Sequence, residues 1–168
     1  MSIINRKISQ LSLQQLAILS SIFLLLSGCS ATRKTKLQEQ EADAVIRAAR
    51  SYIGTPYKWG GTTRSGIDCS GLITNAFSAI KQSLPRTADA QAAIGEQIGI
   101  ADIKPGDLVF FATGKKKKEI THVGIVTTVK AKDDIKFIHA STSLGVVETN
   151  LFSDYYKRRF CLAKRIID

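Results

Sequence analysis

The chain falls into three parts that differ in how apolar and polar residues follow one another. An apolar run covers Leu16 to Leu26 and comes after two cations, Arg6 and Lys7. From Glu41 to about residue 94, apolar residues recur every three or four positions, the spacing of helices with one buried face. After residue 107, short runs rich in Val, Ile, Thr and Phe are separated by Gly, Pro, Asp and Lys, which is typical of β-strands.

The middle part predicts three helices. The first ends at Gly54, the position typical of a glycine that follows a helix, and Pro56 comes shortly after it. Its apolar face comprises Ala42, Val45, Ile46, Ala49 and Ile53. The second helix is expected to begin at residues 68–70 and to run to Ile80, and a turn over 84–87 leads into a short third helix over 88–94.

The last part predicts five strands. They cover residues 107–113, 121–130, 136–142, 145–150 and 158–167. Helices followed by a run of adjacent strands predict an α+β fold in which N-terminal helices pack on an antiparallel sheet. Gly114 and the four lysines Lys115–Lys118 form the tip of a hairpin, and both a solvated loop and a contact with an anionic polymer remain open for them.

The N-terminal apolar run has the organisation of a secretory signal. Its eleven residues, at about 1.5 Å each, are too short to cross a hydrocarbon layer of about 30 Å. Leu26-Ser27-Gly28-Cys29 resembles the bacterial lipoprotein box, in which the cysteine receives a diacylglyceryl group and becomes the first residue. A plain signal peptide with an incidental cysteine is the alternative. By resemblance to enterobacterial sorting rules, Ser30 indicates the outer membrane.

These features divide the chain into three segments. We expect a lipoprotein signal peptide over residues 1–28, a lipidated N-terminus with a polar tether over 29–40, and one folded domain over 41–168. Several acyl chains on Cys29 would hold the protein at a membrane.

The composition and the net charge limit the classes of molecule that the chain is expected to bind. Of 168 residues, 44% are hydrophobic and 23% charged, and three cysteines are too few for a disulfide scaffold. The net charge is +10, and removal of the first 28 residues leaves +8. Such a charge favours anionic surroundings. Because an exported lipoprotein rarely meets nucleic acid, we expect anionic cell-wall polymer or lipid headgroups instead.

Cys69 stands where the second predicted helix begins. The unpaired N–H groups and the partial positive charge of a helix N-terminus lower a thiol pKa and can hold an oxyanion beside the sulfur. Asp68 and Ser70, on either side, are residues that commonly cap a helix.

The two histidines of the chain, His122 and His139, each lie in a β-branched strand segment. A lone histidine in such a strand is usually a core residue, but two on neighbouring strands together with Cys69 indicate a catalytic set. His122 would take the thiol proton and later protonate the leaving amine. His139 would hold the ring of His122 in the useful tautomer.

Several motifs together resemble the NlpC family of papain-like cell-wall peptidases, and within it the Spr-like murein endopeptidase lipoproteins. The similarity covers about residues 42–165. Its motifs are Tyr57-Lys58-Trp59-Gly60-Gly61, Asp68-Cys69-Ser70-Gly71, Leu84-Pro85-Arg86-Thr87 with Gln91, Pro105-Gly106-Asp107-Leu108-Val109-Phe110-Phe111, His122-Val123-Gly124-Ile125 and His139-Ala140-Ser141.

The resemblance implies a papain-like fold with a five- to six-stranded sheet and a cysteine peptidase that needs no cofactor. Its substrate would be peptidoglycan stem peptides or their cross-links, cut through an acyl-enzyme. Cys69 is carried over as nucleophile, His122 as general base and His139 as the orienting residue. The Tyr57 hydroxyl is a candidate oxyanion donor, with ordinary packing as its alternative.

Other residues have two possible roles. Arg86 is either a bidentate partner for a substrate carboxylate or a solvated turn residue, and Trp59 is either a cleft wall or a core residue. Cys161 is expected to be a buried, inert strand residue without a disulfide to Cys69.

Three other functions remain open. A Cys/His/His zinc hydrolase would use the three candidate catalytic residues as metal ligands. A non-catalytic peptidoglycan-binding lipoprotein and an acyltransferase are the other two. The sequence does not indicate which murein bond is cut.

Overall fold

The structure is a computed structural model that describes residues 13–116 and 119–167, with side chains from residue 32 onward. Contacts divide the chain into two units, Met1–Glu39 and Gln40–Asp168. The second unit contains the sheet and all the candidate catalytic residues. The predicted cations of the signal peptide, Arg6 and Lys7, and the side chain of Cys29 lie outside the described residues.

The first helix starts much earlier than the apolar pattern predicts. Helix α2 spans Leu13–Arg50, so the segment predicted as a polar tether is helical. From Cys29 to Arg50 the chain has no glycine or proline and is rich in Ala, Arg, Lys, Gln and Glu, all strong helix formers. Its C-terminal end agrees with the prediction, because a turn follows and Gly54 has a φ of +83°. Within the described part of the chain, no helix is both long and apolar enough to cross a membrane.

The second and third predicted helices are confirmed. Helix α3 covers Cys69–Phe77 and continues into a 3₁₀ turn, η1 (Ser78–Ile80), while α4 covers Ala88–Ala92. Before α3, a two-stranded hairpin pairs β1 (Thr62–Thr63) with β2 (Gly66–Ile67).

One six-stranded sheet follows, in the order β3-β8-β4-β5-β6-β7, with all neighbouring strands antiparallel. The strands are β3 (Glu96–Ile98), β4 (Leu108–Phe111), β5 (His122–Ala131), β6 (Asp134–Ser141), β7 (Gly145–Asn150) and β8 (Phe160–Arg165). This confirms the predicted α+β fold. The sequence analysis missed strands β1, β2 and β3 and two further elements, η2 (Ile100–Asp102) and α5 (Asp154–Lys157), because each is only two to four residues long.

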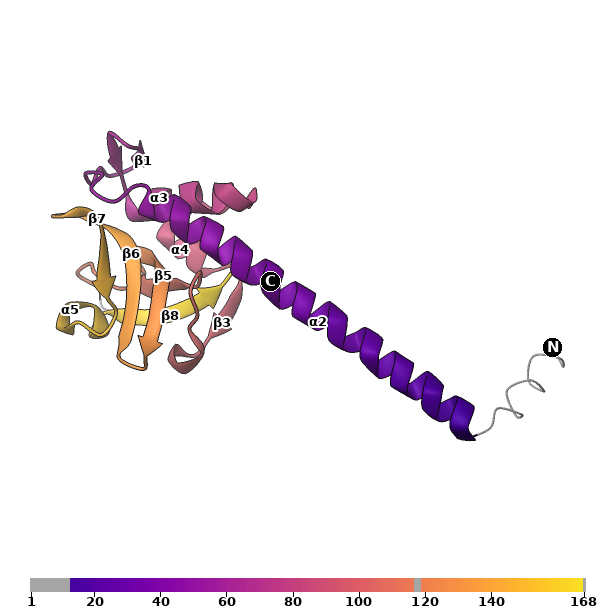
Figure 1. Cartoon of the computed structure of the whole chain (residues 1–168). Helices are drawn as coiled ribbons and strands as arrows, with labels where there is room; N and C mark the ends of the chain where they lie inside the picture. The colour runs from indigo at the N-terminus through magenta and orange to yellow at the C-terminus, as the bar shows by residue number, and fades with distance from the viewer. Residues whose placement is uncertain (1–12, 117–118, 168) are drawn as a thin grey trace. The chain divides into compact units, whose positions relative to one another are not determined.

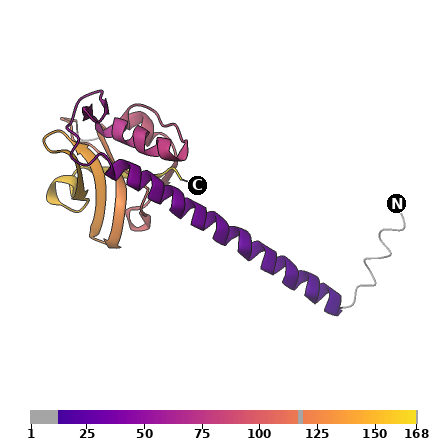
Figure 2. The ribbon, with the colours of Figure 1, turned by 45° about the horizontal axis from the view of Figure 1, so that its top comes forward.

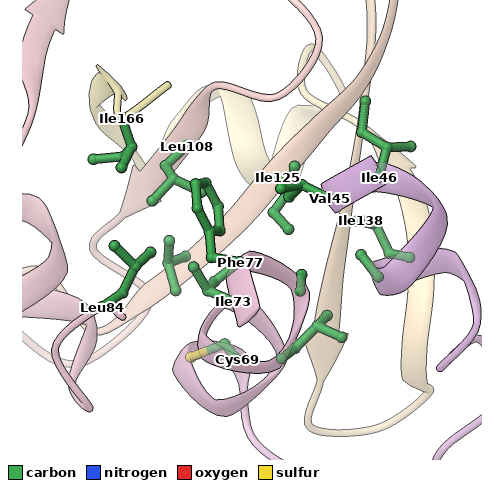
Figure 3. Close-up of a cluster of buried hydrophobic side chains, with 14 of the residues drawn as sticks. Val45, Ile46, Cys69, Ile73, Phe77, Leu84, Leu108, Ile125, Ile138 and Ile166 are labelled. Carbon is green, nitrogen blue, oxygen red and sulfur yellow. The ribbon is translucent and has the colours of Figure 1, made fainter. Parts of the chain in front are cut away.

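The sheet is buried on both faces, and β4 shows how. Leu108 and Phe110 point into a core shared with α2, α3 and α4, whereas Val109 and Phe111 point into a second core that α5 covers. Figures 1 and 2 show α3 and α4 beside the last turns of α2 on one side of the sheet. Cys69 lies within the first core, among the aliphatic side chains drawn in Figure 3.

Candidate active site

Asp68 holds the start of α3 in place. Its backbone is extended, with φ −95° and ψ 174°, and its Oδ1 accepts a hydrogen bond from the N–H of Gly71 at 2.7 Å, so it is the helix N-cap that the sequence predicts. Its Oδ2 accepts from the N–H of Gly60 at 2.8 Å. One carboxylate therefore ties the loop that contains Tyr57 to the helix that contains Cys69.

Arg86 completes this junction. Its Nη1 donates to Asp68 Oδ1 at 2.9 Å and its Nη2 to Oδ2 at 2.7 Å, the bidentate geometry of a strong ion pair. Nη1 also donates to Ser70 Oγ at 2.9 Å. Burial alone would raise the pKa of the Asp68 carboxyl, but the hydrogen bonds from Arg86 and Gly71 outweigh burial and hold that pKa below its usual value. The fork that we considered for a substrate carboxylate is thus occupied by Asp68.

Gln91, from α4, connects the Leu84–Thr87 turn to the first turn of α3. Its side chain is fully buried, and its Nε2 donates to the Pro85 carbonyl at 2.7 Å and to the Ser70 carbonyl at 3.1 Å. The Leu84–Thr87 turn and the first turn of α3 are therefore joined through a buried amide.

The Cys69 sulfur lies against backbone N–H groups. The N–H groups of Val123, on β5 next to His122, and of the first residues of α3 lie close enough to the sulfur to affect its pKa. These groups favour a thiolate, yet burial outweighs them and the Asp68 carboxylate adds to its effect, so the pKa of Cys69 is raised. The sequence analysis predicted that the helix N-terminus lowers this thiol pKa, whereas in the folded chain burial has the larger effect and raises it. Only 7% of the residue is exposed, which accounts for the size of the burial effect.

The two imidazoles are in direct contact. His122 Nε2 lies 3.0 Å from His139 Nδ1, and both side chains are buried. This contact engages Nε2 of His122, so Nδ1 is the ring nitrogen that remains for a second partner. On its other side, His139 Nε2 lies 3.1 Å from the Thr149 hydroxyl.

Burial keeps both rings neutral. Desolvation lowers the pKa of His122 to about 4 and, together with the neighbouring His122, that of His139 to about 3. A neutral His122 can accept a proton at neutral pH, which is what a general base requires.

The strand geometry explains why the histidines meet. Pairing between β5 and β6 runs from Ile125↔Ile138 to Ala131↔Asp134, so both histidines lie beyond its last pair. Continued along the strands, this register places His139 opposite Gly124, with His122 two residues away on the same face. Diagonal neighbours on one face are within reach of ring side chains.

Aromatic rings surround the pair. The ring of Phe137 stacks on His139 with centroids 4.8 Å apart, and Phe111 lies 6.1 Å from His122. The ring centroid of Tyr156, from α5, lies 6.3 Å from that of His122 and 5.0 Å from that of His139. The sequence analysis did not identify Tyr156 or Thr149, since contacts on separate elements leave no local motif.

Tyr57 and Trp59 occupy the loop in front of α3. Burial raises the pKa of the Tyr57 hydroxyl, and the charges of Cys69 and Asp68 raise it further, so the phenol lies near the sulfur and keeps its proton. Trp59 is 86% exposed, which excludes the core role considered for it.

The remaining candidates are Cys161 and the lysines of the β4–β5 connection. Cys161 is on β8 as predicted, but it is exposed rather than buried, and both it and Cys69 are free thiols. Lys115 and Lys116 are exposed in the β4–β5 connection, where Lys116 pairs with Glu119 at 3.4 Å, whereas residues 117–118 lie outside the described part.

Within the described part of the chain, the cysteine and the histidines neither form a metal-binding cluster nor line the cavity at the β3 edge of the sheet. No three His, Cys, Asp or Glu side chains in the described part of the chain are arranged to hold a metal ion. A cavity of about 500 Å³ lies at the β3 edge of the sheet, between η2 and Arg165, and none of the three candidate catalytic residues lines it.

Comparisons with known proteins agree with these motifs. The sequence profile of the NlpC/P60 family matches residues 54–165. The chain is 40% identical over 150 residues to the probable endopeptidase NlpC of Escherichia coli K12, covering 85% of this chain and 94% of that protein. It is 33% identical over 135 residues to the murein DD-endopeptidase MepS/murein LD-carboxypeptidase of the same strain, covering 80% and 63%.

A solved structure shares the fold. An NlpC/P60 family protein from Bacillus cereus ATCC 10987 matches with a TM-score of 0.68 and 26% identity, covering 76% of this chain. This chain spans 40% of that longer protein.

Proposed function

The chain belongs to the NlpC/P60 family of cysteine peptidases, and from this premise we propose that it hydrolyses amide bonds in peptidoglycan stem peptides or their cross-links. Three residues are assigned to the chemistry, Cys69 as nucleophile, His122 as general base and His139 as the residue that orients His122. The main support is the buried contact of 3.0 Å between His122 Nε2 and His139 Nδ1, beside Val123, whose N–H lies near the Cys69 sulfur.

The reaction starts from a neutral thiol and a neutral imidazole. As the sulfur attacks the amide carbonyl, the thiol proton moves to Nδ1 of His122 and a carbon–sulfur bond forms. His122 then gives this proton to the leaving amine as the carbon–nitrogen bond breaks, and an acyl-enzyme remains. Water hydrolyses the thioester, with His122 again accepting a proton, and the thiol is restored.

In this mechanism two groups would stabilise the oxyanion. The first N–H groups of α3 point toward the region of the sulfur, and Tyr57 presents a protonated hydroxyl near Cys69. Both are held by Asp68, which caps α3 and binds the loop that follows Tyr57.

Substrate charge and protein charge are complementary. Stem peptides carry free carboxylates, whereas the chain from Cys29 onward carries +8. Attraction between them increases the local substrate concentration and weakens as salt is added. We place the enzyme in the cell envelope, anchored by lipid on Cys29 at the periplasmic face of the outer membrane, where it meets this polymer.

The test compares two cysteine variants on purified sacculi. Cys69→Ala should lower the release of soluble fragments by roughly a thousandfold or more, because the nucleophile is lost. Cys161→Ala, the matched control, should behave as the wild type, since Cys161 is exposed on β8 and has no role in the proposed reaction. Mass spectrometry of the new amine and carboxyl ends identifies the bond that is cut.

Two results would contradict this function. Unchanged digestion by Cys69→Ala would favour a non-catalytic binding lipoprotein. Inhibition by a chelator, with no effect of iodoacetamide, would favour a zinc hydrolase.

A further inference from the structure

The buried hydrogen-bonded chain does not stop at His139. The Thr149 hydroxyl, on β7, lies 3.1 Å from His139 Nε2, on the side of the ring opposite His122. The strand register accounts for this position, because β6 and β7 pair His139 with Val147 and Phe137 with Thr149. His139 and Thr149 are thus diagonal neighbours on one face of the sheet.

Which group donates and which accepts in each hydrogen bond follows from the proton transfer at Cys69. His122 can accept the Cys69 proton only if its Nδ1 is bare, so its own proton sits on Nε2 and is donated to His139 Nδ1. His139 must then carry its proton on Nε2. That N–H donates to Thr149 Oγ1, which acts as the acceptor that ends the chain.

We infer that Thr149 is a positioning residue for this reaction, one that holds His139 in the ring orientation and tautomer that keep His122 a base. The inference rests on the proposed function, because only the proton transfer from Cys69 sets the direction of the chain. Which ring nitrogen of a histidine carries the proton is set by the hydrogen bond that the other nitrogen makes. With both nitrogens of His139 engaged, a rotation of its ring by 180° would break two hydrogen bonds.

A second hydroxyl near His139 offers an internal comparison. The Tyr156 hydroxyl lies 3.5 Å from His139 Nδ1, at the outer limit of a hydrogen bond. That nitrogen has a single lone pair, which His122 already engages at 3.0 Å. Tyr156 therefore contributes its ring, which packs on both imidazoles, and its hydroxyl is not required to orient His139.

The kinetic test replaces the hydroxyl without changing the shape of the side chain. Thr149→Val keeps a β-branched residue on β7 and should lower kcat about tenfold on soluble muropeptide dimers, as expected for the loss of one neutral hydrogen bond. KM should stay the same, because the inferred role of Thr149 is to orient His139 and not to bind substrate. Thr149→Ser keeps the hydroxyl and should restore most of kcat.

A spectroscopic test of the full-length chain does not depend on activity. The chain has two histidines, so ¹⁵N-histidine spectra contain two imidazoles, and His139→Gln assigns them. In the wild type we expect His139 to be protonated at Nε2. Thr149→Val should bring its two ¹⁵N shifts closer together, as tautomers mix, whereas Tyr156→Phe should leave them unchanged.

Three outcomes would overturn the inference. They are a wild-type His139 protonated at Nδ1, unchanged shifts and kcat in Thr149→Val, and a shift produced by Tyr156→Phe in its place. The first outcome is measured on the wild-type protein, so it tests the inference even if Thr149→Val does not fold. Wild-type protein that leaves muropeptides intact would contradict the peptidase function instead, while the spectra still report on the Thr149 contact.

Discussion

At the scale of single residues, burial decides the protonation states of the site. The helix N-terminus and the Val123 N–H favour a Cys69 thiolate, yet the loss of solvent around the sulfur has the larger effect on its pKa. The same loss of solvent keeps His122 and His139 neutral. In the proposed mechanism, the reaction therefore begins with proton transfer from a neutral thiol to a neutral imidazole.

The histidine pair should make stability depend on pH. In the folded chain the pKa of His122 is about 4 and that of His139 about 3, against 6.5 for an unperturbed histidine. Below pH 6.5 the unfolded state binds more protons, so the free energy of unfolding falls as the pH decreases from about 6.5 toward 4. Between pH 7 and pH 5, urea unfolding should show a loss of at most roughly 2 kcal/mol per imidazole.

The control for this pH effect is the double variant His122→Gln/His139→Gln. It lacks both titrating rings, and its stability should change much less over the same interval. An equal loss in the double variant would mean that other groups cause the pH dependence.

At the scale of secondary-structure elements, the site depends on the region where β5 and β6 stop pairing. Gly124 lies there, between His122 and the first paired residue, Ile125. A Cβ on Gly124 would lie 2.5 Å from Phe137 Cδ2 and 2.8 Å from the Ile138 carbonyl oxygen. The strand can approach β6 only because this residue has no side chain.

Gly124→Ala should therefore lower both stability and activity. The added methyl group must displace Phe137, whose ring stacks on His139, or push β5 away from β6. Overpacking of this kind costs about 1–3 kcal/mol, which urea unfolding measures. Activity should fall by more than unfolding accounts for, because the His139 ring moves with Phe137.

Gly99→Ala is the matched control for the Gly124 variant. Its added Cβ would meet only the Asp102 carboxylate, at 3.1 Å, and that side chain is exposed and free to move. Both properties should stay close to wild type. Equal effects of the two alanines would contradict a special role for Gly124.

At the scale of the whole molecule, the proposed lipid anchor and the positive net charge both suit a protein of the cell envelope. The proposed lipid on Cys29 places a domain of positive charge at an envelope surface beside an anionic polymer. The tether predicted between lipid and domain is helical, since strong helix formers continue without a glycine or proline up to Arg50.

Lipidation is tested by metabolic labelling with palmitate. Wild-type chain should incorporate the label, and Cys29→Ser should lose all of it, because the thiol that carries the diacylglyceryl group is gone. Cys161→Ser, which removes an exposed thiol on β8, should keep it. Label retained by Cys29→Ser would show that the resemblance to a lipoprotein box is incidental.

Much of the fold and the candidate site is local in origin and was predictable. Helical spacing ended at Gly54, Asp68 and Cys69 marked the start of α3, and β-branched runs located five of the six strands of the main sheet. The short β3 and α5 were missed, because three or four residues contain too little periodicity to identify an element. The helical tether was missed, because propensity rather than apolar spacing governs a solvent-exposed helix.

The sequence by itself determined which residues are chemically able to act, because residue type and helix or strand position are local properties. Tertiary structure alone decided which atoms meet: His122 Nε2 with His139 Nδ1, His139 Nε2 with Thr149, and Arg86 with Asp68. It also decided the charge state of the site, and the physical reason is that pKa values depend on how much solvent packing removes. No single segment of the chain contains that information.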